Sequence, residues 1–167
     1  MSCDNYSDIW KPFAECWVKF WPACPYPVLL ISETKPFDHP IIGNLQTGKR
    51  MPWGEMLLHV LERVHTPYIL YLQEDYLLRS PVDEQELIHY FKLLKQVNGA
   101  YLRLLPWPGP DRLHPDIPRL GLVEPGTKYR TSLQAAIWDK VVLQSLVDPL
   151  DDGRFESWSL ERANQID

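Results

Sequence analysis

Short apolar runs alternate with helical patterns in the first two thirds of the chain, and this alternation restricts the fold more than any other feature. Residues 27–32 (PVLLIS), 68–72 (YILYL) and 100–105 (AYLRLL) have the length and composition of buried strands. Residues 53–64 and 83–97 place apolar side chains at helical spacing between those runs. Strands joined through helices form βαβ units. We therefore expect an α/β fold, a Rossmann-like three-layer α/β/α sandwich with a mainly parallel sheet.

The flanking segments are expected to complete a single domain over residues 1–167, because no repeat or linker divides the sequence. A helix capped by Ser7 or Asp8 is predicted over residues 8–21, and residues 33–52 lack periodicity and are expected to form a loop. Because a doubly wound fold normally begins with a strand, we expect the chain to begin just past its first strand. The C-terminal part is predicted to begin with a stiff proline-rich loop over residues 106–118, followed by extended segments over residues 120–123 and 129–137. A helix capped by Asp139 is predicted over residues 139–147, and a last helix over residues 155–164.

The composition excludes some partners and favours a ligand cleft. Lys and Arg number 17 against 22 Asp and Glu, a net charge of −5, which is the wrong sign for a protein that coats nucleic acid. The 7 Trp, 8 Tyr and 5 Phe exceed the usual needs of one core, so some rings are expected to line a cleft and stack on planar or ring-shaped ligands.

Cysteine spacing and hydropathy favour a cytoplasmic protein. Cys3, Cys16 and Cys24 are odd in number and lack metal-ligand spacing, so we expect reduced thiols. The longest aliphatic run, residues 28–31, is too short to cross a bilayer, and no transmembrane segment is expected. Peripheral contact with a membrane stays open.

Acidic residues follow the second predicted strand directly. Gln73, Glu74 and Asp75 come after residues 68–72, and ligands of parallel sheets bind beyond the carboxyl ends of the strands. Carboxylates at that edge can hold Mg²⁺ or Mn²⁺, and the cation can neutralise a departing diphosphate. The alternative is that Glu74 and Asp75 only begin a solvated loop.

Residues 43–50 (GNLQTGKR) approach the phosphate-binding P-loop pattern without completing it. Arg50 stands where a hydroxyl should bind magnesium, and no strand leads directly into the segment, so a P-loop NTPase is not expected. Lys49 and Arg50 remain candidates for contact with a phosphate, the alternative being an exposed basic loop.

Two carboxylates near the C-terminus are candidates for proton transfer. Glu156 and Glu161 flank Trp158, and a carboxylate beside an aromatic ring in a partly dry pocket can act as a general base. They lie five residues apart, about 140° around a helix, so they cannot both face one substrate. The alternative is a surface helix with ordinary exposed Glu residues.

Several segments recur in this order in one protein group. Taken together, they resemble the GT-A-like glycosyltransferases of bacterial surface-polysaccharide synthesis, which use nucleotide-diphosphate sugars. The similarity runs from Ser2 to about Glu161, and the order and spacing of the motifs carry it. The segments are residues 2–10 (SCDNYSDIW), 20–22 (FWP), 72–76 (LQEDY), 129–138 (YRTSLQAAIW) and 156–161 (ESWSLE).

The resemblance implies a GT-A type of sandwich and a nucleotide site. By position, Asp4 would accept a hydrogen bond from the base and Tyr6 would pack nearby. Glu74 and Asp75 would stand at the acidic metal- and diphosphate-binding motif, a divalent-cation site for Mn²⁺ or Mg²⁺. The usual Asp-x-Asp reads Gln73-Glu74-Asp75 here, so its first carboxylate is missing.

The resemblance also implies roles nearer the C-terminus. Glu161 would be the catalytic base, with Glu156 as the second choice. Arg130 and Gln134 would contact a donor phosphate or sugar, and the alternative for Arg130 is a buried structural role.

We therefore expect a glycosyltransferase of hexosyltransferase type that moves a sugar from a nucleotide diphosphate to a hydroxyl of a glycan or lipid-linked glycan. One alternative is a noncatalytic glycan- or partner-binding module on a degenerate transferase fold. Another is nucleotidyl transfer, which would release pyrophosphate.

Overall fold

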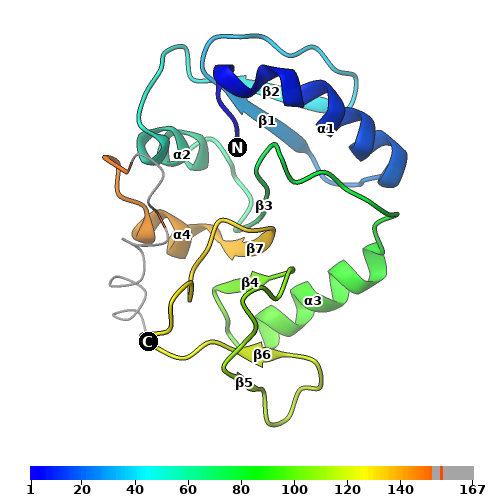
Figure 1. The fold of residues 1–167 in the computed structure, drawn as a ribbon, viewed down its shortest axis with the longest axis vertical. Coiled ribbons are helices and arrows are strands. Elements are labelled where there is room, and N and C mark those ends of the chain that lie inside the picture. Colours follow the sequence, from blue (N-terminus) through cyan, green and yellow to red (C-terminus); the bar gives the residue numbers. More distant parts are fainter. Residues whose placement is uncertain (152–154, 156–167) are drawn as a thin grey trace.

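The computed structural model describes residues 1–151 and residue 155. Helices and short strands alternate along the chain, and Figure 1 shows their arrangement. In order they are η1 (Asp4–Tyr6), α1 (Ser7–Phe20), β1 (Val28–Ser32), β2 (Ile42–Gln46), α2 (Trp53–Leu61), β3 (Tyr68–Tyr71), α3 (Glu84–Gln96), β4 (Tyr101–Arg103), β5 (Arg112–Leu113), β6 (Gly121–Leu122), β7 (Ala136–Asp139) and α4 (Lys140–Leu146).

The described strands form three small sheets, so the expected mainly parallel, Rossmann-like three-layer sandwich of GT-A type is wrong. β1 and β2 make a two-stranded parallel sheet. β3, β7 and β4 make an antiparallel sheet with β7 in the middle, and β5 and β6 make an antiparallel pair. Parallel pairing is therefore confined to β1 and β2 among the residues described.

β7 is the reason that the βαβ argument failed. β3 and β4 are joined through α3 and both pair antiparallel with β7, so they share a direction as that argument requires. β7 lies between them, however, with Ala136 opposite both Tyr71 and Arg103. β7 follows β4 only after the long connection that contains β5 and β6. Pairing between strands so far apart in the chain leaves no periodic signal in the sequence.

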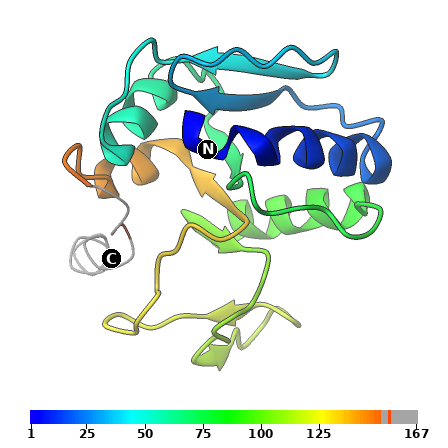
Figure 2. The same cartoon turned by 45° about the horizontal axis from the view of Figure 1, so that its top comes forward.

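Two helices cover opposite faces of the β1–β2 sheet. Successive strand residues point to opposite faces, and accordingly Leu30 packs in a cluster with Trp10 and Trp17 of α1, whereas Ile31 packs with Met56 of α2. Figure 2 shows the two strands above α1, with α2 beside them. This arrangement fixes where β1 ends and therefore where the chain enters the candidate site.

The other main core lies between α2, α4 and the three-stranded sheet. Trp138 of β7 and Leu143 of α4 are fully buried there, together with Leu57 of α2. The Asp139 side chain accepts hydrogen bonds from the N–H groups of Val141 and Val142 at 2.8 and 3.0 Å, which confirms the predicted cap of α4.

Other local predictions had mixed outcomes. Asp83 accepts a hydrogen bond from Glu86 N–H at 3.0 Å and caps α3, as expected. The predicted Ser7 or Asp8 cap of α1 is wrong, because Tyr6 occupies the cap position and makes no side-chain bond there. The expected loop over residues 33–52 contains β2.

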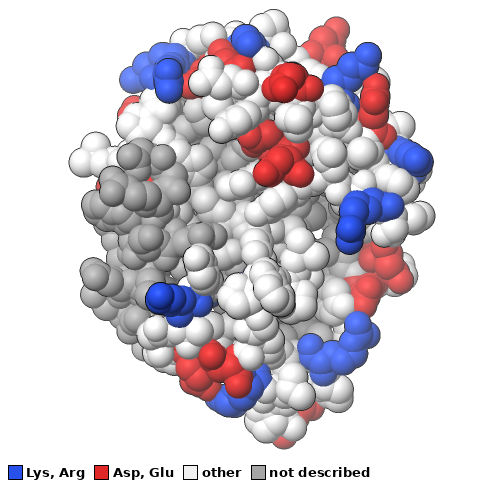
Figure 3. Space-filling model, in the orientation of Figure 1, with Lys and Arg blue, Asp and Glu red and all other residues white. Residues whose placement is uncertain are grey.

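Charged side chains lie mainly around the rim and the upper half of the face seen in Figure 3, and the centre of that face is uncharged. Cys3, Cys16 and Cys24 are free thiols. Within the described part of the chain, no helix combines the length and apolarity needed to span a membrane.

Candidate functional site

A polar cavity of about 740 Å³ lies where β1 and β3 end. Its wall combines the N-terminal segment, the residue that follows β1, the approach to α2 with its first turns, and two residues that follow β3. These are Met1, Ser2, Cys3, Asn5, Tyr6, Glu33, Arg50, Met51, Pro52, Trp53, Met56, Gln73 and Glu74. Four separate segments therefore meet at one concave surface.

The N-terminal segment is fixed between the two strand ends. The Met1 amine donates to the Leu72 carbonyl at 2.7 Å, beyond β3. The Trp10 indole N–H donates to the Ser2 hydroxyl at 2.7 Å, and this bond is buried. The segment therefore presents Asn5 and Tyr6 to the cavity, and Tyr6 remains 56% exposed.

Asp4 connects this segment to the loop after β1. Its carboxylate accepts hydrogen bonds from the N–H groups of Glu33, Thr34 and Lys35 and from the Thr34 hydroxyl. Burial acts to raise the pKa of Asp4, but these hydrogen bonds outweigh it and hold the pKa below its ordinary value. The predicted contact of Asp4 with a nucleotide base stays a prediction, since the bonds seen here orient the loop.

Glu33 and Arg50 form a charged pair on the cavity wall. The Arg50 Nε atom lies 3.9 Å from Glu33 Oε1, and Glu33 Oε2 accepts from the Asp4 backbone N–H at 3.0 Å. The Glu33 side chain is only 10% exposed, whereas the Arg50 side chain is 83% exposed. Arg50 can therefore turn its guanidinium toward an anion in the cavity at little cost.

Glu74 is the predicted strand-end acid that reaches the cavity. It is half-buried, and burial raises the pKa of its carboxyl, with the nearby Met1 ammonium opposing that effect. Asp75 is exposed and is not part of the cavity wall. The structure thus separates two carboxylates that the sequence argument treated as one metal-binding pair.

The described cavity wall offers a divalent cation few free carboxylates. Glu33 is engaged by Arg50 and by the Asp4 N–H, which leaves Glu74 as the other carboxylate on that wall. No group of three or more His, Cys, Asp or Glu side chains occurs among the residues described. The expected Mn²⁺ or Mg²⁺ stays a prediction.

Arg130 and Gln134 lie apart from this wall. Arg130 donates its backbone N–H to the Thr127 carbonyl, and the Gln134 amide donates to the Trp107 carbonyl at 2.7 Å. Neither residue lines the cavity. Glu156 and Glu161 lie outside the described residues, so their predicted role as catalytic base is untested.

Sequence reasoning missed Glu33 and Trp53 as parts of the wall. Glu33 falls in the segment expected to form a loop, and Trp53 falls in the apolar pattern that predicts a helix. Arg50 had a signal, because the incomplete P-loop pattern had left Lys49 and Arg50 as candidates for phosphate contact. Arg50 lines the cavity, whereas Lys49 lies 3.6 Å from Glu55 in an ion pair.

Comparison of the chain with protein-family models, with curated proteins and with solved structures finds no match. The resemblance to glycosyltransferases therefore rests on the motifs themselves.

Proposed function

We propose that the polar cavity binds a nucleotide-diphosphate sugar and that the protein transfers the sugar, a hexose, to a hydroxyl of a glycan or lipid-linked glycan. The observation that carries the proposal is the meeting of three segments at one polar cavity beyond two strand ends. The residues that they supply are Ser2, Cys3, Asn5 and Tyr6, then Glu33, and then Gln73 and Glu74. Two of the segments that resemble glycosyltransferases supply residues to that wall.

The side chains on the wall suit the parts of such a donor. The rings of Tyr6 and Trp53 offer flat surfaces to a base or a sugar. The amides of Asn5 and Gln73 can donate to and accept from hydroxyl and carbonyl groups. The exposed guanidinium of Arg50 matches a phosphate, which it can contact through two parallel N–H donors.

In the proposed reaction an acceptor hydroxyl attacks the anomeric carbon while a carboxylate takes its proton. The bond between that carbon and the diphosphate oxygen breaks, and the electron pair leaves with the nucleoside diphosphate. Arg50 would offset the charge that develops on the leaving group. Glu161 remains the first choice for the proton acceptor.

The donor and the free thiols together suggest a cytoplasmic location. Nucleotide sugars are soluble small molecules, and three free cysteines are typical of a reducing compartment. Contact with a membrane surface would be peripheral and would come from a lipid-linked acceptor.

Calorimetry with UDP- and GDP-sugars, with and without Mn²⁺, tests the proposal. Arg50→Gln should weaken binding of the nucleotide sugar about tenfold, since one charge-assisted contact to phosphate is lost. Lys49→Gln is the matched control, because it removes the same charge from the neighbouring residue of the same loop, outside the cavity wall. Absence of nucleotide-sugar binding, or equal losses in the two variants, would overturn the assignment.

A glycan- or partner-binding module remains the second candidate, and one observation favours it. Trp107 is 80% exposed and Leu113 is 69% exposed on the long connection before β7. An exposed indole such as that of Trp107 can stack on the face of a sugar without any nucleotide. Glycan binding that survives Arg50→Gln, with no nucleotide affinity in the parent chain, would select this alternative.

A further inference from the structure

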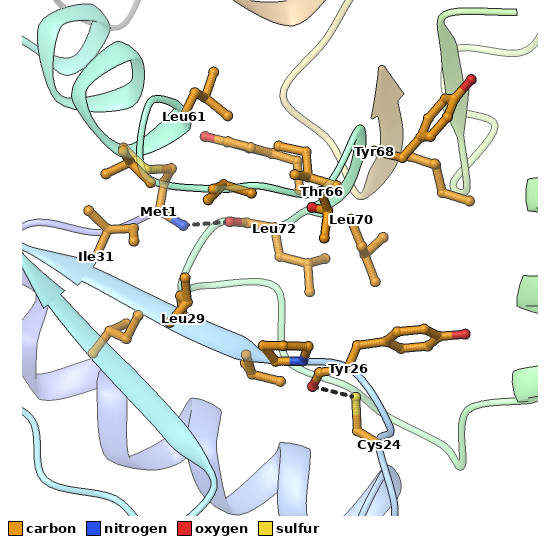
Figure 4. Close-up of a pocket in the computed structure, with 18 of the residues that line it drawn as sticks. Met1, Cys24, Tyr26, Leu29, Ile31, Leu61, Thr66, Tyr68, Leu70 and Leu72 are labelled. Atoms are coloured by element: carbon orange, nitrogen blue, oxygen red, sulfur yellow. Dashed lines mark hydrogen bonds between the residues drawn. The ribbon is translucent and has the colours of Figure 1, made fainter. Parts of the chain in front are cut away.

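Residues 103–130, the connecting lobe, run from the end of β4 through β5 and β6 and form a surface apart from the polar cavity. Figures 1 and 2 show the β5–β6 pair at the opposite end of the molecule from the β1–β2 sheet. The molecule also has an apolar groove of about 610 Å³, with Leu29 on one side and Leu70 on the other (Figure 4). The described residues of that groove do not identify an occupant, whereas the connecting lobe combines apolar side chains with positive charge.

The connecting lobe exposes four large apolar side chains. Trp107 and Leu113 are the most exposed of them, and Leu105 and Tyr129 are each exposed by about half. A folded chain gains free energy when it buries side chains of this size. Their joint exposure on one segment therefore favours a partner that covers them.

Two of the exposed rings lie on chain segments that one guanidinium connects. Arg103 donates to the Trp107 carbonyl at 3.3 Å and to the Tyr129 carbonyl at 3.2 Å. The Gln134 amide donates to the Trp107 carbonyl as well, at 2.7 Å. The backbones of Trp107 and Tyr129 are thereby brought next to each other, while their side chains stay exposed to solvent.

The β5–β6 pair has one apolar face. Leu113 lies opposite Gly121 in the register, and side chains directly opposite each other share a face of the pair. A Cβ atom at Gly121 would lie 2.3 Å from the Pro110 ring, so Pro110 covers this glycine. Arg112 belongs to the other face, where it forms an ion pair with Glu124. Leu113 is therefore presented beside a proline ring and a glycine.

The connecting lobe is positively charged in an acidic chain. It holds five Arg and Lys against three Asp and Glu, a net charge of +2, whereas the whole chain has −5. Asp111 accepts a hydrogen bond from the Glu124 N–H at 2.8 Å, and the Glu124 carboxylate pairs with Arg112. Lys128 is exposed and forms no ion pair with any residue that the structure describes. Among the three acids, Asp116 alone lies outside these bonds.

This combination of side chains suits a membrane surface better than a sugar. Trp and Tyr are enriched where a bilayer meets water, and Lys and Arg are attracted to anionic headgroups. A sugar site needs polar side chains free to bond hydroxyl groups, but Arg103 and Gln134 already donate to backbone carbonyls. The aliphatic side chains of Leu105 and Leu113 likewise offer no flat ring for stacking on a sugar.

We propose that the connecting lobe binds the surface of a bilayer that contains anionic lipids, with Trp107 and Leu113 entering the interface and Lys128 contacting the headgroups. Binding of this kind grows with the apolar area that enters the interface and with the attraction between the protein and anionic lipids. The proposal stands on the residues of the lobe and does not require that the polar cavity bind a nucleotide sugar.

Cosedimentation of the full chain with vesicles tests the proposal. Vesicles of phosphatidylcholine mixed with phosphatidylglycerol should bind the chain more tightly than vesicles of phosphatidylcholine alone. Trp107→Ser and Leu113→Ser should each weaken binding to the mixed vesicles roughly tenfold, because each removes a large apolar side chain from the interface. Leu150→Ser is the matched control, since Leu150 is 81% exposed and lies outside the lobe.

The charge is tested separately. Lys128→Gln should weaken binding to the mixed vesicles about fivefold, because one cation near an anionic surface is lost. It should leave binding to phosphatidylcholine alone unchanged. Lys11→Gln is the control, since Lys11 is an exposed lysine of α1, at the other end of the molecule. Both positions are exposed, and equal Tm values for the parent and the variants would show that folding is preserved.

Absence of binding to the mixed vesicles, or equal losses in Leu113→Ser and Leu150→Ser, would overturn the proposal. Unchanged vesicle binding in Trp107→Ser, together with loss of binding to dextran, would also overturn it and assign the ring to a glycan. Vesicle binding is measured without nucleotide sugar. A chain that binds vesicles but no nucleotide sugar would therefore support this proposal and overturn only the proposed sugar transfer.

Discussion

The Asp4 carboxylate accepts hydrogen bonds from three consecutive backbone N–H groups, those of residues 33–35. As in a helix N-cap, one carboxylate accepts hydrogen bonds from backbone N–H groups that would otherwise lack a protein partner. Asp4 thereby positions Glu33, whose side chain in turn lies beside Arg50. One acidic side chain thus organises a large part of the cavity rim.

Asp4→Asn should lower the free energy of unfolding by about 1 kcal/mol at pH 7, a modest loss because the site is exposed to solvent. Because the pKa of Asp4 is below its ordinary value, this stabilisation is present above that value and is lost as the pH falls through the lower, folded-state pKa. Urea unfolding at pH 7 and pH 3 measures both effects. Asp38→Asn, on the same loop, is the control, and an equal loss in Asp38→Asn would contradict the assignment.

Proton transfer at Glu161 can be separated from donor binding. Glu161→Gln should lower turnover by roughly 10²- to 10⁴-fold while nucleotide-sugar affinity stays within twofold, because the amide keeps the shape but cannot accept the proton. Glu156→Gln is the comparison, since the two carboxylates cannot both face one substrate. Release of nucleoside diphosphate measures turnover, and full activity of Glu161→Gln would eliminate Glu161 as the base.

At the scale of elements, α2 is held to the segment after α4 by a close approach at Gly54. A Cβ atom at Gly54 would lie 1.8 Å from the Asp148 carbonyl oxygen, and the Gly54 N–H donates to the Asp151 carbonyl at 3.0 Å. Only a residue without a side chain allows this approach, so the glycine fixes where the helix meets the chain that leaves α4.

Gly54→Ala should destabilise the protein by roughly 2 to 3 kcal/mol, although alanine is otherwise the better helix former by about 1 kcal/mol. The sign of the change is therefore informative. Gly109→Ala is the matched control, because no atom lies within 4 Å of the added Cβ there. Thermal unfolding measures both variants, and a stabilised Gly54→Ala would show that the close approach relaxes freely.

Elements with local causes could be predicted from the sequence. The caps at Asp83 and Asp139 depend on bonds to residues two or three positions away, and both form as expected. β1 and β3 were found because their composition is apolar and their ends are marked by prolines. β2 was missed because Ile42–Gln46 contains Gly43 and Asn44, which weaken a strand pattern.

Pairing between distant segments could not be predicted. Nothing in residues 136–139 indicates that they insert between β3 and β4, since that choice depends on a whole core centred on Trp138. The sequence predicted Glu74 as a site residue but did not predict its separation from Asp75. The turn after β3 decides which of the two carboxylates points to the cavity. Arg50 was found only through an incomplete motif.

At the scale of the whole molecule, Met1 links the β1–β2 sheet to the three-stranded sheet at the wall of the polar cavity. It bonds the Leu72 carbonyl beyond β3, and its side chain packs with Ile31 of β1. Burial lowers the pKa of this amine from 8.0 to about 6, although Glu74 and Asp75 act to raise it. The folded state therefore binds fewer protons than the unfolded state between pH 6 and 8.

It follows that stability should rise with pH across this window, because stability increases with pH wherever the unfolded chain holds more protons. The full effect is at most roughly 3 kcal/mol, the equivalent of a pKa lowered by about two. The comparison is a chain acetylated at Met1, which keeps one N–H for Leu72 but cannot be charged. Urea unfolding at pH 5.5, 7 and 8.5 should show a gap between the chains that closes as the pH rises. Parallel curves would mean that the amine is solvated, and the junction between the two sheets would then be open to water.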